Sequence, residues 1–439
     1  MFHVEHFSIL LCMSFSLAHA EDFASELLPV WEPSLISAAS SCNSVPAREH
    51  TAQGWQALIM GDQEWARCQF ETAVNAEEKA AMPRLGLLLC GDTAQREPLL
   101  TLLKEASLNP AEAFYVETLL RFLGGDMKGA AEDFQQRAEQ FRADHFSAYW
   151  SILLMHYSGE RDKALRSAQT LLQRYPEDGL AHFLRALMEE DYGKDKKVTD
   201  EALQSARRCT EIFPSSAMAH QLYGHLLFIS GHAEQSLQAF RATMMKTDGI
   251  LYYTAALYEA TALWCLKQDD ASLERRRSLN SELNLTACPK TEAEWLWRWE
   301  VNTLPLRILI TRPELPTATE IRLAKKAATP TKTWKEDTVT LLYRDTLELI
   351  LVARLRHDAS FLNKAEEKFH AFVQAGCPSA SPMAVTCYHR AAEAMAISLH
   401  TARAELFSSE TRDIWNQNRQ EATRPASRLL PPIIPERLK

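Results

Sequence analysis

Along most of the chain, runs with apolar residues at helical spacing alternate with single glycines or short polar turns. The stretch LLFISGHAEQSLQAFRATM, residues 226–244, shows the unit. An apolar run stops at Gly231, and small or aromatic residues return at Ser236, Phe240 and Thr243. Residues three and four positions apart share one face of an α-helix, and glycine takes the left-handed backbone that ends a helix. The pattern predicts two helices joined by a tight turn.

The glycine of this unit recurs at nearly regular distances. A glycine followed by a polar residue stands at Gly61, Gly91, Gly125, Gly159 and Gly231, at intervals of 30, 34, 34 and 72. The distance from the first to the last is 170, which is five times 34. A period of this length predicts a solenoid of stacked helix pairs. The longest interval then contains one pair without the glycine, joined by an enlarged polar turn at about residues 192–199.

Composition supports an all-α fold. The chain has 439 residues, is 46% hydrophobic and 24% charged, and contains only 14 glycines and 19 prolines. Breakers this sparse exclude a fibrous or disordered chain. Stretches rich in Ala, Leu, Glu, Gln and Arg, which favour helix, fall between the breakers. We therefore expect helices throughout.

The residues around each glycine resemble the tetratricopeptide repeat. In that family the first helix carries a small residue near its middle, and the second carries alanine with an aromatic residue four positions later. Residues 54–73 match with Gly54, Ala57, Gly61, Ala66, Phe70 and Ala73. Later pairs match with Gly125, Ala130, Phe134, Gly159, Ala164, Pro176, Pro214, Tyr223, Gly224 and Phe240. The pair in residues 80–110 departs from the pattern, because Arg96 and Leu100 replace the alanine and the aromatic residue.

This resemblance implies a right-handed α-solenoid over residues 48–290. Beyond residue 290 the period fades but helical character remains, so we expect degenerate repeats or a helical cap in residues 291–420. Residues 21–47 form an N-terminal segment, and residues 421–439 a basic, proline-rich tail.

The first twenty residues have the pattern of a secretory signal. The apolar run FSILLCMSFSLAHA ends in a small-x-small motif at Ala18 and Ala20, and Glu21 and Asp22 follow at once. Cleavage after residue 20 would make the protein exported, either periplasmic or secreted. The run is too short for a membrane span, and no later segment has 18 uninterrupted apolar residues. We therefore expect no stable membrane span.

Charge is unevenly distributed. Residues 21–290 hold 38 acids and 27 bases, and residues 291–439 hold 18 acids and 21 bases. The acidic front half argues against nucleic acid as a partner, because phosphates require clustered Lys and Arg. It favours a protein or peptide partner, either an apolar segment with basic flanks or a basic surface.

The family resemblance implies a concave groove lined by the first helices. Carried over position by position, the groove residues are Trp55, Tyr115, Leu119, Phe122, Phe146, Tyr149, Leu153, His156, Gln221, His225 and Phe228. The Lys, Asn and Arg residues with which one subgroup clamps a peptide carboxylate are missing from these positions. Packing between helices is the alternative role for each side chain.

The tail itself resembles the expected ligand. Leu429, Leu430, Ile433 and Ile434 lie between Arg428 and Arg437. Self-association through the tail, within one chain or between copies, is therefore a hypothesis.

Two cysteine pairs bracket expected turns. Cys68 and Cys90 are symmetric about the turn between two antiparallel helices, and Cys377 and Cys387 flank a turn at residues 378–382. In an exported chain this arrangement favours disulfides. The alternative is that free cysteines fill small positions in the core.

Catalytic signatures are missing from the sequence. It contains no phosphate-binding glycine loop, GxSxG, HExxH or paired CxxC motif, so we expect no enzyme activity, cofactor or metal. His182 and His220 each follow alanine near the start of a first helix, which favours packing or surface roles. The alternative function is carbohydrate binding or turnover by Trp295, Trp297 and Trp299, with Glu292, Glu294 and Glu300 nearby. Helical spacing separates Trp297 from the other two tryptophans, which favours packing at a domain junction.

Overall fold

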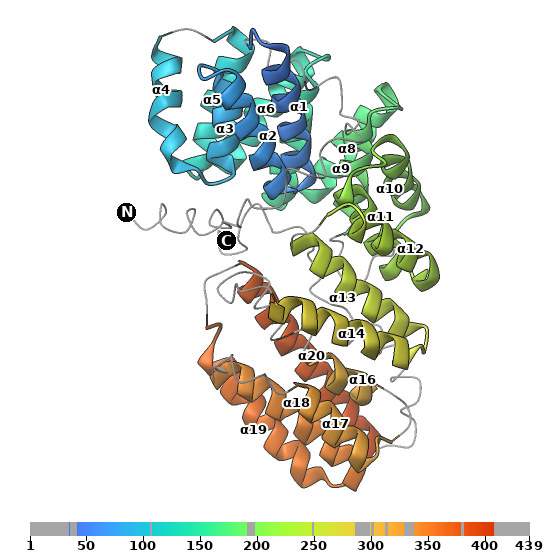
Figure 1. Ribbon diagram of the computed structural model, residues 1–439. Coiled ribbons are helices and arrows are strands. Elements are labelled where there is room, and N and C mark those ends of the chain that lie inside the picture. Colours follow the sequence, from blue (N-terminus) through green and yellow to red (C-terminus); the bar gives the residue numbers. More distant parts are fainter. Residues whose placement is uncertain are drawn as a thin grey trace. The chain divides into compact units, whose positions relative to one another are not determined.

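The computed structural model describes residues 35, 42–105, 108–190, 198–247, 250–285, 299, 303–311, 315–328, 338–378 and 382–407. Every regular element in these ranges is helical, and none of them contains a strand (Figure 1). The prediction of an all-α fold with sequentially packed helices is confirmed. The expected signal (1–20) and the tail (421–439) lie outside the described residues.

Contacts divide the described residues into two units, which meet in sequence between Ser230 and Gly231. Unit 1 contains α1 (Val45–Met60), α2 (Gln63–Ala76), α3 (Ala81–Leu89), the 3-10 turn η3 (Thr93–Gln95), α4 (Arg96–Lys104), α5 (Pro110–Leu123), α6 (Met127–Gln140), α7 (His145–Tyr157), α8 (Arg161–Arg174), α9 (Gly179–Glu190), α10 (Asp200–Ile212) and α11 (Ala217–Ile229). Unit 2 contains α12 (Ala233–Met244), α13 (Ile250–Cys265), α14 (Asp269–Leu285), α16 (Leu304–Thr311), α17 (Ala318–Ala328), α18 (Thr338–Arg356), α19 (Ala359–Ala375) and α20 (Pro382–Phe407).

Unit 1 is a stack of helix pairs. Helices α1 and α2, α5 and α6, α7 and α8, and α9 and α10 pack as pairs. The second helix of each pair also packs against a first helix that follows it, as α6 does against α7 and α8 against α9. The pair α9 and α10 is the one predicted without a glycine. There Glu189 accepts hydrogen bonds from the N–H (2.8 Å) and the hydroxyl (2.7 Å) of Thr199, which caps α10.

The predicted glycines do end first helices. At the end of α1, Gly61 has φ +89°, its N–H donates to the Leu58 carbonyl (3.1 Å), and the Asp62 N–H donates to the Ala57 carbonyl (2.8 Å). These two bonds satisfy carbonyls that the end of a helix leaves unpaired. Positive φ angles recur at Gly91, Gly125, Gly159 and Gly231.

The same turn occurs twice without glycine. Lys267, between α13 and α14, has φ +61° and donates its N–H to the Trp264 carbonyl (2.9 Å). His357, between α18 and α19, has φ +52° and donates to the Arg354 carbonyl (3.3 Å). Residues other than glycine rarely adopt this left-handed backbone conformation, because it brings Cβ close to a carbonyl oxygen. The sequence pattern could not reveal these turns, since it relied on glycine.

Small residues admit an aromatic ring between helices in unit 1. Phe70 of α2 is fully buried, and its ring lies where added Cβ atoms of Gly54 (2.5 Å) and Gly86 (2.3 Å) would stand. Gly54 belongs to α1 and Gly86 to α3. Phe70 therefore fills the space where three helices meet, which explains the glycine-aromatic pattern.

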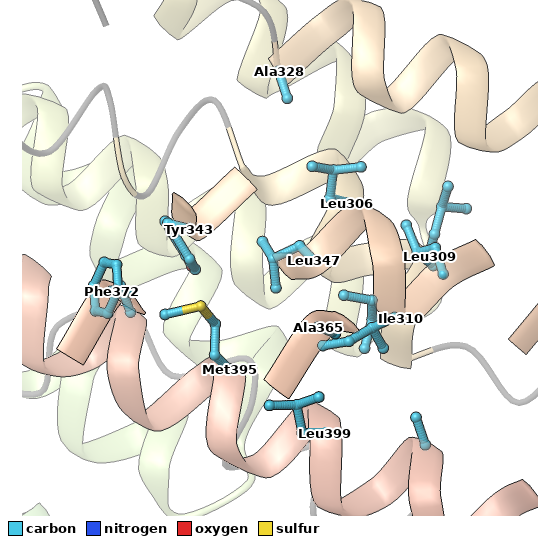
Figure 2. Close-up of a cluster of buried hydrophobic side chains, with 14 of the residues drawn as sticks. Leu306, Leu309, Ile310, Ala328, Tyr343, Leu347, Ala365, Phe372, Met395 and Leu399 are labelled. Atoms are coloured by element: carbon cyan, nitrogen blue, oxygen red, sulfur yellow. The ribbon is translucent and has the colours of Figure 1, made fainter. Parts of the chain in front are cut away.

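Unit 2 is built around α18, which contacts α16, α17, α19 and α20. Its core contains Trp299, Tyr343, Phe372 and Tyr388, and Figure 2 shows several of the aliphatic side chains around them. Phe372 and Tyr388 stack with ring centroids 4.7 Å apart. Arg354 is buried, and its Nη1 donates to the carbonyls of Leu309 (3.0 Å) and Ile310 (2.8 Å) near the end of α16.

Residue 290, where the repeat period fades, falls within unit 2. A core cluster joins Ala256, Trp264 and Leu279 to Leu304 and Ile308, so side chains on both sides of residue 290 share one interior. The repeat period therefore ends within unit 2, where helices from both sides of residue 290 pack together.

Replacing Lys267 or His357 with glycine should raise the free energy of unfolding by about 0.5–1 kcal/mol, because glycine tolerates the left-handed backbone. Urea titration of the whole chain, followed by circular dichroism, measures the change. Gly125→Ala is the matched control: an added Cβ meets no atom within 4 Å, so strain alone should lower stability by about 1 kcal/mol. A loss of stability in both glycine variants would contradict the interpretation.

Gly86→Ala should lower the free energy of unfolding by about 1–3 kcal/mol, because the added methyl group overlaps the Phe70 ring. The loss should exceed the gain of up to about 1 kcal/mol that alanine brings to a helix interior. In a Phe70→Leu background the same substitution should be neutral or stabilising. Urea titration of the four proteins tests this coupling, and equal effects of Gly86→Ala in both backgrounds would refute it.

Candidate functional site

Ten of the eleven expected groove residues are interior. Trp55, Phe146 and Tyr149 are 0% exposed, and of the eleven only Phe228 is half-buried. The buried ones are Trp55, Tyr115, Leu119, Phe122, Phe146, Tyr149, Leu153, His156, Gln221 and His225. Burial of these ten side chains favours the alternative role, packing between helices.

Helix α1 packs against part of this set of residues. Besides its own pair, α1 contacts α7 and α9. Its Trp55 ring lies 4.9 Å from the Phe146 ring and 6.0 Å from the Trp150 ring, both on α7. At the end of α1, Met60 Sδ lies 3.8 Å from the Ser216 hydroxyl. The inner side of the helix stack is thus covered by a helix of the same unit.

The side chains around Trp55 form what we call the inner aromatic cluster. Tyr115 and Phe146 have ring centroids 4.5 Å apart, and Phe134 and Trp150 stack at 6.4 Å. The members are Trp55, Phe70, Tyr115, Phe134, Phe146 and Trp150. Aromatic pairs of this geometry each stabilise by about 0.5–1.5 kcal/mol beyond the area they bury. The cluster therefore holds α1, α2, α5, α6 and α7 together.

A tyrosine–aspartate contact joins α7 to the helix pair that follows it in unit 1. The Tyr149 hydroxyl of α7 donates to Asp178 Oδ2 (2.6 Å), 29 residues later. Asp178 precedes α9, and its Oδ1 accepts the N–H of Ala181 (2.8 Å). His145 Nδ1 lies 2.9 Å from Asp178 Oδ2. The carboxylate therefore caps one helix while it holds the previous one.

Tyr115 and Asp144, also 29 residues apart, repeat this contact one pair earlier. Asp144 caps α7 through the Ser147 N–H (3.0 Å) and accepts Arg137 Nε (2.6 Å). Burial and the nearby Asp144 carboxylate, to which the hydroxyl hydrogen-bonds, raise the pKa of Tyr115. The Arg137 guanidinium also lies over the rings of Phe114 (4.7 Å) and Tyr115 (5.3 Å). Both tyrosines, which the family resemblance assigns to a groove, therefore join successive helix pairs.

The histidines at equivalent repeat positions also have structural partners. His182 Nε2 lies 2.9 Å from the Pro176 carbonyl, and His220 Nε2 lies 3.1 Å from the Pro214 carbonyl. Both carbonyls are six residues upstream. Burial lowers the pKa of His182, which favours the neutral imidazole. Both side chains are half-buried, which agrees with the expected packing or surface role.

The disulfide predicted between Cys68 and Cys90 is wrong, since both thiols are free. Arg67 Nη2 of α2 reaches the Cys90 carbonyl (2.5 Å), and the adjacent Cys68 points about 100° away around the helix. Burial raises the pKa of Cys90 to about 12, so its thiol stays protonated and unreactive at neutral pH. Cys377 is half-buried, while the side chain of Cys387 lies outside the described residues, so their pairing stays a prediction.

Of the three tryptophans considered for sugar binding, the structure describes Trp299. Trp299 is fully buried, and its Nε1 donates to the Thr340 hydroxyl (2.7 Å). Trp295, Trp297 and the acids Glu292, Glu294 and Glu300 lie outside the described residues. For Trp299 the packing interpretation is confirmed.

Accessible apolar side chains lie elsewhere. Among the described residues, the exposed large hydrophobic ones are Val45, Trp65, Phe141, Met245, Leu315, Leu323 and Val373. Among the described residues, no group of three or more His, Cys, Asp or Glu side chains could hold a metal ion. No helix in the described ranges has the length and apolar character needed to cross a membrane.

Tyr149→Phe should lower the free energy of unfolding by about 1.5–3 kcal/mol, because a buried hydrogen bond to a carboxylate is lost. Tyr223→Phe is the control: Tyr223 is half-buried and makes no hydrogen bond among the described residues. Its effect should stay within about 0.5 kcal/mol. Thermal unfolding of the three proteins at pH 7 compares them, and equal midpoints would show that the Tyr149–Asp178 contact contributes nothing to stability.

Comparison with models of known protein families finds no match, and comparison with curated proteins finds none either. Membership of the tetratricopeptide family therefore stays a prediction, carried by the repeat spacing and by the turns of this chain. Function has to be argued from its surfaces.

Proposed function

We propose that this protein is an exported, non-enzymatic scaffold that binds protein or peptide partners. The observation that carries the proposal is the use of the inner aromatic cluster for packing, while aromatic side chains remain exposed on outer surfaces of unit 1. Such a frame holds exposed side chains at fixed positions, as binding surfaces on solenoids require.

The proposed contact residues are Trp65 and Phe141. Trp65 lies in the first turn of α2 and is 38% exposed, and Phe141 follows α6 and is 49% exposed. Tryptophan and tyrosine are enriched among residues that dominate binding energy, and aromatic residues in general are enriched at interfaces. Glu139 is exposed and lies two residues before Phe141 in the sequence, and its carboxylate suits an apolar partner with basic flanks.

Several features support the absence of an enzyme activity. Burial raises the pKa of Cys42 to about 11 and of Cys90 to about 12, so neither thiol is a nucleophile at neutral pH. The Tyr149–Asp178–His145 contact is almost fully buried and caps a helix, so it would not meet a substrate. Export rests on the sequence of residues 1–20, and docking of the tail rests on the sequence of residues 421–439.

Affinity capture from the native extracytoplasmic fraction tests the proposal. The bait is residues 21–439, compared with a Trp65→Ala/Phe141→Ala variant whose fold is checked by circular dichroism. The amount of a partner protein captured by the variant should be at least fivefold lower than the amount captured by the unchanged bait. The affinity of that partner for the purified variant should be lower by the same factor. The matched control is Met245→Ala/Val373→Ala, which removes exposed apolar side chains from unit 2. Equal capture by all three baits would argue against the proposed surface.

A further inference from the structure

Helix α17 is a short, well-capped helix on the surface of unit 2. The Thr317 hydroxyl accepts the Glu320 N–H (3.2 Å), and Glu320 Oε2 accepts the Thr317 N–H (2.7 Å). This reciprocal cap fixes the first turn. Ile321, Ala324 and Ala328 are buried in the core of unit 2. One face of α17 is therefore anchored, which holds the opposite face in a fixed orientation.

The opposite face is basic and carries exposed leucine. Residues 319, 322, 323 and 326 are exposed and share one side of the helix by their spacing. Leu323 is 58% exposed, and Leu315, just before the helix, is 59% exposed. We call the group formed by Leu315, Arg322, Leu323 and Lys326 the α17 face.

The two cations of the α17 face differ from the neighbouring Lys325 in their ion pairing. Lys325 Nζ pairs with Glu348 Oε1 (2.7 Å), whereas Arg322 and Lys326 form no ion pair with any described residue. The carboxylate of Glu320 is engaged in the cap. Two cations without an ion-pair partner among the described residues thus share this helix with the exposed Leu323.

This chemistry fits an acidic protein segment with large apolar side chains. An anionic membrane is a poorer fit, because the apolar side of α17 is already buried in unit 2 and cannot insert. Nucleic acid is also a poorer fit, since two unpaired cations neutralise few phosphates. Single exposed leucines are common on protein surfaces, but here the two leucines occur together with unpaired charges of one sign.

The chain itself encodes a matching segment, EDFASELLPVWEPS, at residues 21–34. It carries four acids and no Lys or Arg, and its large apolar residues are Phe23, Leu27, Leu28, Val30 and Trp31. We propose that the α17 face binds residues 21–34 of a second copy of this chain. Such a small contact gives weak association, with a dissociation constant of about 10–100 µM. This inference does not rest on the proposed scaffold function, because no other protein takes part.

Sedimentation velocity of purified residues 21–439 over a range of concentrations, at low and high salt, tests the inference. We expect reversible self-association that weakens at high salt. Arg322→Glu/Lys326→Glu should raise the dissociation constant about tenfold. The reciprocal change, Glu26→Lys/Glu32→Lys, should do the same. Combining both changes should restore the constant to within about threefold, which a damaged fold could not do.

Two further proteins make the test specific. Arg166→Glu/Arg174→Glu changes the net charge equally on exposed positions of α8 and should leave association unchanged. Leu323→Ser should weaken it without changing its salt dependence. A chain that stays monomeric at all concentrations would overturn the inference, as would association that persists in Arg322→Glu/Lys326→Glu. Neither result bears on capture through Trp65 and Phe141, so the two proposals fail separately.

Discussion

The packing of α1 against α7 determines what the rest of unit 1 can do. Trp55 sits among Phe146, Trp150 and Phe70, and this contact spans more than 90 residues of sequence. A repeat array whose first helices faced solvent would present those aromatic side chains to a partner. Here the array's own first helix covers them. The described large hydrophobic side chains that remain exposed in unit 1 are Val45, Trp65 and Phe141.

Local devices keep the repeats in order around that contact. Positive-φ turns at Gly61, Gly91, Gly125 and Gly159 reverse the chain within pairs. Between successive pairs, Tyr115 and Tyr149 reach the aspartates that cap α7 and α9. Each such aspartate satisfies helix N–H groups and a tyrosine hydroxyl at once, so loss of one carboxylate disturbs two helices. The tyrosines and aspartates of these contacts are buried, so they offer little surface to a partner or a substrate.

The sequence predicted the features that depend on neighbours three or four positions apart. Gly54, Phe70 and the turn glycines were identifiable because a small residue, an aromatic residue and a helix stop recur in phase. The turns at Lys267 and His357 escaped because residues other than glycine adopt the same backbone there. The burial of the groove positions escaped because it depends on where α1 lies, and no local pattern encodes that. The family resemblance indicated where each residue lies along its helix. It could not indicate which other helix packs against that residue.

Charge is unevenly distributed along the chain. The sequence places most of the negative charge before residue 290 and a small excess of bases after it. Helix α17 of unit 2 carries three of these bases. Lys325 pairs with Glu348, whereas Arg322 and Lys326 are exposed and form no ion pair with any described residue. A charge without a counter-ion costs little in water, so its presence alone implies nothing. Two such charges held beside Leu315 and Leu323 by a capped helix make a surface whose best complement is acidic and apolar, and the chain carries that complement in residues 21–34.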